Sequence, residues 1–153
     1  ILDEVVVKGK DKRISCLLYI ARMQTKTYSR GFLYAYNNKD QLIFKTDAVS
    51  GSWSSSYTIP EGNYKATQFI DTVEPEFSRH KVGFKVVLGP DPYDPYRGKT
   101  RSLLRIHPAR GKYTAGCIGL ITDNVDSLKS MERIFKMSIN NNSIPLGVEI
   151  LNR

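Results

Sequence analysis

The stretch of sequence that decides the fold lies late in the chain. It reads Ser102-Leu103-Leu104-Arg105-Ile106-His107-Pro108-Ala109-Arg110-Gly111-Lys112-Tyr113-Thr114-Ala115-Gly116-Cys117-Ile118-Gly119-Leu120. Its first residues predict a strand that ends at His107, and a glycine-containing loop then reverses the chain. Cys117 follows ten positions after the histidine, at the start of a second apolar run. This spacing permits a thiol and an imidazole to face each other.

Such a pair suits nucleophilic catalysis. A thiol becomes a strong nucleophile when a base removes its proton, and an imidazole is a suitable base. Gly116 allows a tight turn, and the successive amides of Ala115, Gly116 and Cys117 are expected to point at a developing oxyanion. Taken singly, a cysteine is more often inert core, and a histidine such as His107 is more often packed or solvated. The residues alone leave both interpretations open.

The remainder of the chain predicts a mainly β fold. Short apolar runs separated by turn residues predict strands at 4–7, 14–23, 31–36, 42–49, 63–70, 82–88, 102–107 and 146–151. One helix is indicated, because N-cap residues at 122–124 precede Val125, Leu128, Met131 and Phe135, whose spacing gives one apolar stripe. We expect this stripe to pack on the sheet.

Length and composition indicate one soluble globular domain over residues 1–153. A chain of 153 residues with 41% hydrophobic and 25% charged residues can bury a core and is too apolar for a disordered chain. No apolar stretch approaches the roughly 20 residues that cross a bilayer. The net charge of +8 favours anionic partners, but the basic residues are spread along the chain, which argues against nucleic acid. No signal peptide precedes Ile1, so we expect a mature form or an excised domain.

The remaining thiol and imidazole are expected to be structural. Cys16 lies in a strand-like run, where a thiol behaves as a small hydrophobe, so we expect it in the core and unpaired with Cys117. His80 lies among cations and is expected to be a solvated surface residue. Once Cys117 and His107 are assigned, too few ligands remain for an ordinary zinc site. We expect neither a metal nor a cofactor.

The pattern resembles the catalytic domain of the L,D-transpeptidases, whose hallmark is a strand ending in Ile-His, a short loop, then Ser or Thr, any residue, Gly and Cys. Ile106-His107 and Thr114-Ala115-Gly116-Cys117-Ile118 match it in order. Ala48-Val49-Ser50-Gly51 and residues 58–64 resemble the family's Ser-Gly strand end and its Thr-Pro-x-Gly-x-Tyr or Phe segment. The likeness extends over residues 42–151. It implies a β-rich sandwich or barrel with one main helix after the cysteine.

Three departures separate this chain from many family members. Many family members carry His directly before Gly-Cys and Arg two positions after the cysteine, where this chain has Ala115 and Gly119. The spacing of ten between histidine and cysteine is also shorter than the commonest one. Such short variants resemble the L,D-transpeptidase-type toxins that bacteria deliver to one another.

The resemblance implies a peptidoglycan-modifying enzyme. Cys117 would attack a stem tetrapeptide at its diamino acid and release the terminal D-alanine, with His107 as base and then as acid. An amine acceptor gives L,D-transpeptidase action, and water gives L,D-carboxypeptidase action. The implied location is the periplasm or cell wall of its own or a target cell, with an immunity protein as partner if the domain is a toxin. The alternatives are a catalytically silent wall-binding module and a cysteine protease or amidase.

Further residues are expected around the pair. Arg105 lies two positions from His107 on the same strand face, and either it or Arg110 is expected to bind the substrate carboxylate, although Arg105 also suits a plain surface cation. Thr114 is expected to orient the site through its hydroxyl. The three prolines of segment 89–98 predict a loop or lid there. Aromatic residues on this segment and on the Ser-rich loop 51–57 are expected to clasp the stem peptide in a cleft past the cysteine: Trp53, Tyr57, Tyr93 and Tyr96.

Overall fold

The computed structural model describes residues 4–5 and 12–153, and most of its elements are strands. The strands are β1 Glu4–Val5, β2 Cys16–Met23, β3 Ser29–Tyr36, β4 Leu42–Ser50, β5 Gly62–Asp71, β6 Ser78–Arg79, β7 Val82–Gly89, β8 Tyr93–Asp94, β9 Lys99–Thr100, β10 Arg105–Pro108, β11 Ile118–Leu120 and β12 Ile144–Ile150. A 3-10 helix, η1, spans Pro75–Phe77, and the α-helix α1 spans Val125–Ser138.

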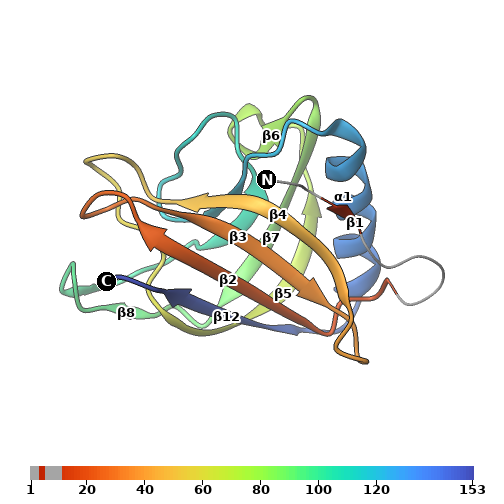
Figure 1. Ribbon diagram of the computed structural model, residues 1–153, viewed down its shortest axis with the longest axis horizontal. Helices are drawn as coiled ribbons and strands as arrows, with labels where there is room; N and C mark the ends of the chain where they lie inside the picture. Colours follow the sequence, from red (N-terminus) through yellow and green to blue (C-terminus); the bar gives the residue numbers. More distant parts are fainter. Residues whose placement is uncertain (1–3, 6–11) are drawn as a thin grey trace.

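The main sheet closes on itself. Its strands follow the order β1-β4-β11-β10-β7-β5-β12-β2-β3, and β3 also pairs with β4, so the path returns to its start (Figure 1). Two neighbouring pairs are parallel, β10 with β11 and β2 with β12. The predicted mainly β, barrel-like class is confirmed. Closure leaves few strand edges for other chains to pair with.

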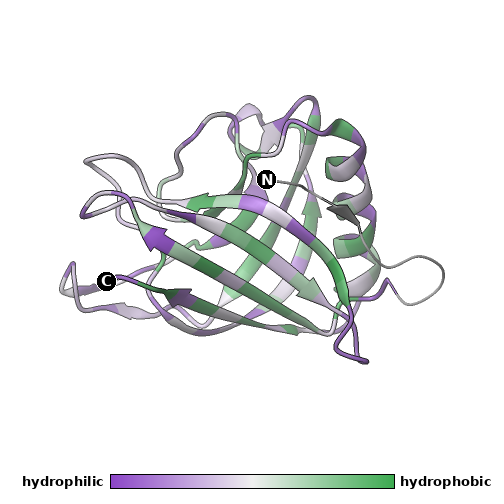
Figure 2. Cartoon of the chain, viewed as in Figure 1, coloured by the Kyte–Doolittle hydropathy of each residue, from purple (hydrophilic) through white to green (hydrophobic). Residues whose placement is uncertain are grey.

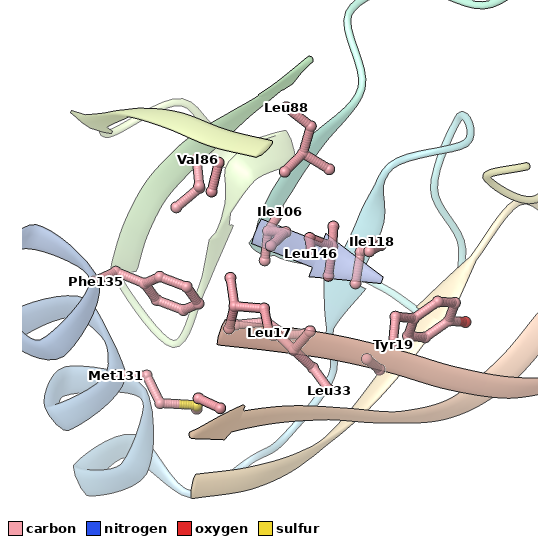
Figure 3. Close-up of a cluster of buried hydrophobic side chains, with 14 of the residues drawn as sticks. Leu17, Tyr19, Leu33, Val86, Leu88, Ile106, Ile118, Met131, Phe135 and Leu146 are labelled. Carbon is pink, nitrogen blue, oxygen red and sulfur yellow. The ribbon is translucent and has the colours of Figure 1, made fainter. Parts of the chain in front are cut away.

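Buried residues alternate with more exposed ones along β2 and β12, and Figure 2 shows hydrophobic and hydrophilic residues following one another along the long strands. In β2, Leu17 and Tyr19 are fully buried, whereas Leu18 and Ile20 are half-buried on the outside. Figure 3 shows the inward side chains of several strands meeting in one core, among them Leu17, Tyr19, Leu33, Val86, Ile106, Ile118 and Leu146. The apolar side chains that alternate along the sequence therefore fill the interior of the barrel.

Helix α1 packs against the sheet through the stripe that the sequence predicts. Its N-cap, Asn124, accepts a hydrogen bond from the Ser127 amide at 3.1 Å. Phe135 is fully buried, and its ring centroid lies 5.6 Å from those of both Phe44 in β4 and Phe84 in β7. The helix has 14 residues, and within residues 4–5 and 12–153 no helix is long and apolar enough to span a membrane.

Three expectations about the elements are wrong. Residues 102–104 do not belong to β10, because Leu103 has a φ of 56°, which extended backbone excludes. The proline-containing segment is not a plain loop, since β8 and β9 pair as a small hairpin. Cys16 is not in the core, because its side chain lies half-buried on the outside of β2, where partial burial raises the pKa of its thiol. Residues 6–7 of the first expected strand lie outside the described residues.

The packing of α1 predicts unequal effects of two truncations on the same helix. Phe135→Ala should lower the free energy of unfolding by about 3–5 kcal/mol, because it empties a site shared by two other rings. Met137→Ala should change it by less than about 0.5 kcal/mol, because Met137 is 40% exposed. Urea unfolding of the three proteins measures both values. Similar losses in the two variants would show that α1 packs through another face.

Candidate active site

The predicted base lies in β10, and the predicted nucleophile directly precedes β11, the strand that pairs with β10 in parallel. Ile106 in β10 lies opposite Ile118 in β11, and His107 lies opposite Gly119. Both isoleucines point into the core, so His107 and Gly119 lie on the outer face. Cys117 comes two residues before Gly119 and directly precedes β11.

The imidazole of His107 is both oriented and shielded. Its Nδ1 lies 2.7 Å from the Pro108 carbonyl oxygen, which can only accept, so the hydrogen-bond network puts the proton on Nδ1 and the lone pair on Nε2. The ring of Phe77 in η1 meets the imidazole edge to face, with centroids 4.9 Å apart. Burial lowers the pKa of His107 to about 4, although the bond to Pro108 opposes the shift. At neutral pH the ring is therefore uncharged.

The thiol of Cys117 contacts a backbone carbonyl. The residue is 7% exposed, and its Sγ donates to the carbonyl oxygen of Leu103 over 3.5 Å. Because a carbonyl only accepts, this contact holds the protonated thiol. The sulfur thus bonds to Leu103 rather than to His107, and a direct bond between thiol and imidazole stays a prediction. Catalytic contacts of this kind often tighten only when substrate is bound.

The hydroxyl of Thr114 organises the turn that leads to the cysteine. Its Oγ1 donates to the Cys117 carbonyl at 2.6 Å and accepts from the amides of Gly116 at 3.2 Å and Gly51 at 3.1 Å. One donated and two accepted bonds use the full capacity of a hydroxyl. The Thr114 amide also donates to the Gly51 carbonyl at 3.0 Å. Thr114 therefore joins the cysteine turn to the Ser-rich loop, at the place where an orienting residue was expected.

Of the three amides expected to point at an oxyanion, that of Gly116 already donates to Thr114 Oγ1 at 3.2 Å. The amides of Ala115 and Cys117 remain as candidates. Gly116 has a φ of 115°, and its carbonyl accepts a bond from Ser50 Oγ at 3.0 Å. Ser50, in the Ser-Gly strand end noted in the sequence, thus holds the cysteine turn through this hydrogen bond.

A buried ion pair next to this turn escaped the sequence analysis. Arg101 is 5% exposed and Asp94 is fully buried, and Nη1 of Arg101 lies 2.8 Å from Oδ2 of Asp94. The same guanidinium donates to the carbonyls of Thr58 at 3.0 Å and Tyr57 at 2.8 Å. A Cβ on Gly116 would collide with its Nη2. Charged residues in a turn-rich segment usually face solvent, so no local signal marks this pair as buried.

Packing at position 119 accounts for one departure from the family pattern. A Cβ on Gly119 would lie 2.6 Å from Cγ2 of Thr114 and 3.0 Å from Cβ of Ala109. The loop 109–117 therefore runs directly over β11, and no arginine fits there. The glycine at 119 therefore goes together with the short spacing between histidine and cysteine, because the short loop packs on that position.

The two arginines expected to bind a carboxylate have different surroundings. Arg105 is half-buried on the outside of β10, and its guanidinium lies 4.8 Å from the ring centroid of Phe77, the ring that also covers His107. Its Nε is buried and has no hydrogen-bond partner among the described residues. Arg110 is exposed in the loop after β10. Of the two, Arg105 is the cation beside the imidazole, and its charge helps to lower the pKa of His107.

The residues expected to form an aromatic clasp lie in separate places. Trp53 is 58% exposed and packs on Tyr28, with ring centroids 6.4 Å apart. Tyr113, which the sequence analysis did not single out, meets the same Tyr28 ring at 5.1 Å. Both aromatic residues neighbour the Thr114–Gly51 contact, so they flank the cysteine turn. In the sequence, the only sign of a role for Trp53 and Tyr113 is that they lie close to the Ser-Gly and Thr-x-Gly-Cys motifs.

Tyr57 and Tyr96 line a different pocket, of about 510 Å³, together with the end of β2 and the last residues of the chain. The guanidinium of Arg153 lies 3.6 Å from the Tyr96 ring centroid. Cys117 does not line this pocket, so it is not the cleft expected past the cysteine. Tyr93 is 63% exposed on β8, at the same end of the barrel (Figure 1).

His80 is exposed, and its Nε2 lies 2.8 Å from Oδ1 of Asp123. Arg79 binds the same oxygen at 2.8 Å and also donates to the Ala109 carbonyl at 3.1 Å and the Thr122 carbonyl at 3.0 Å. These hydrogen bonds from His80 and Arg79 lower the pKa of Asp123. Arg79, which the sequence analysis also missed, thereby fixes the start of the loop after β10. No group of three or more possible metal ligands occurs in the described part of the chain.

Comparison with known proteins identifies the class to which this site belongs. A family model of the L,D-transpeptidase catalytic domain matches residues 27–134, which is more than half of the chain and includes His107 and Cys117. The chain therefore belongs to the L,D-transpeptidase catalytic-domain family, whose members act on peptidoglycan. Neither a curated protein nor a solved structure matches it.

The low pKa of His107 predicts a loss of stability in acid. An unfolded histidine titrates near pH 6.5, so between about pH 6.5 and 4 only the unfolded chain binds this proton, and stability falls as pH falls. Wild type should lose up to about 3 kcal/mol more than His107→Gln across this window. Urea unfolding at several pH values measures the difference. An identical pH dependence of the two proteins would contradict a buried neutral ring.

The contacts of Thr114 predict unequal losses of stability for two conservative changes. Thr114→Val keeps the shape but leaves the buried amides of Gly51 and Gly116 without their acceptor, so it should cost about 1–3 kcal/mol of stability. Thr114→Ser keeps the hydroxyl and loses a methyl group, which should cost less than about 1 kcal/mol. Thermal and urea unfolding compare them. If valine were tolerated as well as serine, the hydroxyl would not organise the turn.

Proposed function

We propose that this domain is a cysteine acyl-transfer enzyme that acts on peptidoglycan stem tetrapeptides, as an L,D-transpeptidase or L,D-carboxypeptidase. One observation carries the proposal. His107 is held neutral by burial with Nδ1 bonded to the Pro108 carbonyl, in the strand that pairs in parallel with the one Cys117 directly precedes. A fixed tautomer with its lone pair on Nε2 is what a general base for a thiol requires.

In the first half-reaction, the thiol turns from Leu103 towards His107 and gives its proton to Nε2. The sulfur attacks the carbonyl carbon of the diamino acid, and the amides of Ala115 and Cys117 stabilise the oxyanion. The imidazolium then protonates the nitrogen of D-alanine. The peptide C–N bond breaks, D-alanine leaves, and the acyl group remains as a thioester on Cys117.

In the second half-reaction, an amine or water attacks the thioester, and His107 takes the proton of the attacking group. The C–S bond breaks and the thiol is restored by that proton. An amine acceptor produces a cross-link or an exchanged terminus, and water produces a tripeptide. The exposed side chain of Ala115, two residues before the cysteine, supports access by either acceptor.

Two nearby features support substrate binding beside the thiol. Arg105, whose buried Nε has no partner among the described residues, suits the terminal carboxylate of the tetrapeptide. Trp53 and Tyr113, on the two loops that meet at Thr114, suit the stem peptide. We propose a periplasmic or cell-wall site of action. The short loop 109–117 supports a delivered toxin domain, for which an immunity protein would be the partner.

The second candidate function is a catalytically silent wall-binding module. The observation in its favour is the hydrogen bond of Cys117 Sγ to Leu103 in place of His107. The glycine at position 119 does not favour the silent module, because the packing of Thr114 already accounts for it. The two functions differ in one measurable respect, which is whether the thiol turns over substrate.

Two single substitutions test the proposal on purified muropeptides, with products read by mass spectrometry. Cys117→Ala should lower kcat/KM for tetrapeptide substrates by at least about a thousandfold, because the nucleophile is lost. Cys16→Ala should keep activity within about twofold, because that thiol lies on the outside of β2. If folded wild type leaves the muropeptides unchanged with both water and amine acceptors, the silent module is favoured. Activity that depends on Cys16 would refute the assignment.

A further inference from the structure

Leu103 is an anomaly next to the nucleophile. Its φ of 56° lies in the left-handed region, where side chains are strained. The other non-glycine residues of the described chain with positive φ are polar: Asp40, His80, Lys81 and Asn141. Leu103 alone among them is bulky and apolar, and it is 72% exposed. Glycine or asparagine would suit this backbone and this exposure better.

The neighbours of Leu103 hold it in this conformation. On one side, the Arg101 amide donates to the Pro92 carbonyl at 2.8 Å, and the Arg101 side chain is fixed by its buried ion pair. On the other side, Leu104 is 3% exposed, and its carbonyl accepts from the Leu88 amide at 3.0 Å. Residue 103 therefore bulges outwards between two anchored residues.

This bulge sends the two ends of Leu103 to different places. Its carbonyl oxygen lies 3.5 Å from Cys117 Sγ, whereas its side chain stands in solvent. The residue whose carbonyl contacts the thiol therefore also presents an exposed apolar side chain. Strained backbone persists only where its surroundings impose it, and it gathers at active sites and ligand clamps.

We propose that Leu103 is a specificity-determining residue whose side chain binds the aliphatic part of an acyl donor at Cys117. For peptidoglycan this inference rests on the proposed function. A diamino acid, whose carbonyl would be attacked, carries methylene groups next to that carbonyl, and these can cover an exposed leucine. Covering it would remove apolar surface from water, which favours donors with an aliphatic chain.

Simple thiol reagents test the inference without any enzyme activity. In a Cys16→Ala background, alkylation of Cys117 is timed with N-methylmaleimide, N-butylmaleimide and iodoacetamide. Cys117 should react with the butyl reagent about three- to tenfold faster than with the methyl reagent, because Leu103 covers part of the added chain. Leu103→Asn and Leu103→Gly both suit the left-handed backbone and should reduce this preference to below about twofold. Iodoacetamide rates should stay the same in all proteins.

Val73→Asn is the matched control, because Val73 is 95% exposed and lies in another segment. It should leave all three rates unchanged, and thermal unfolding should show that every variant folds. The inference is overturned if Leu103→Asn keeps the butyl preference. It is also overturned if the iodoacetamide rate falls in parallel, because Leu103 would then act only by positioning the thiol.

A second arm measures stem-tetrapeptide kinetics. Leu103→Asn should raise KM by about three- to tenfold with kcat nearly unchanged, which is the signature of lost binding. A fall in kcat alone would contradict a binding role. If wild type proves inactive on every muropeptide, the proposed function fails, and the maleimide comparison still decides the role of Leu103.

Discussion

The parallel pairing of β10 and β11 is the constraint on which the rest of the site depends. Parallel neighbours usually need a crossover of a dozen or more residues, yet here residues 109–117 return the chain from Pro108 to Ile118. A connection this short must run along the sheet surface. That explains why Thr114 packs on Gly119, and why both loop ends are tied to other segments, by Arg79 at Ala109 and by Ser50 at Gly116.

The same geometry sets the electrostatics of the base. His107 is enclosed by Phe77 and faces the positive charge of Arg105, and both conditions disfavour an imidazolium. A base with a pKa of about 4 accepts a proton weakly at neutral pH. An anionic substrate group beside Arg105 would offset that charge.

Strands, helix and motif could be predicted because their signals are local. Alternation marks the strands, the spacing of Leu128, Met131 and Phe135 marks α1, and the order of His107 and Cys117 marks the family. Contacts between distant segments carry no such signal. The Arg101–Asp94 pair looks like two solvated charges in a turn-rich stretch, and its burial follows only from the way the β8–β9 hairpin folds back.

Two errors have the same origin. The run 102–107 is apolar enough to predict a continuous strand, but anchoring of Arg101 and Leu104 forces a bulge at Leu103. Cys16 follows an apolar pattern, but its position in the alternation of β2 turns it outwards. In both cases the apolar composition was read correctly, but the position of a single residue depends on contacts with distant segments that the sequence does not display.

The contact between Gly116 and the Arg101 guanidinium also links two positions that lie on different loops. Any side chain at 116 needs the space that Arg101 fills, and any shorter residue at 101 releases Asp94 and the carbonyls of Tyr57 and Thr58 from their shared donor. A substitution at either position alone is therefore expected to destabilise the turn. Among diverging copies of this domain, residues 101 and 116 should covary, and a graft of the cysteine loop onto another barrel will need the hairpin that carries Asp94 and Arg101 with it.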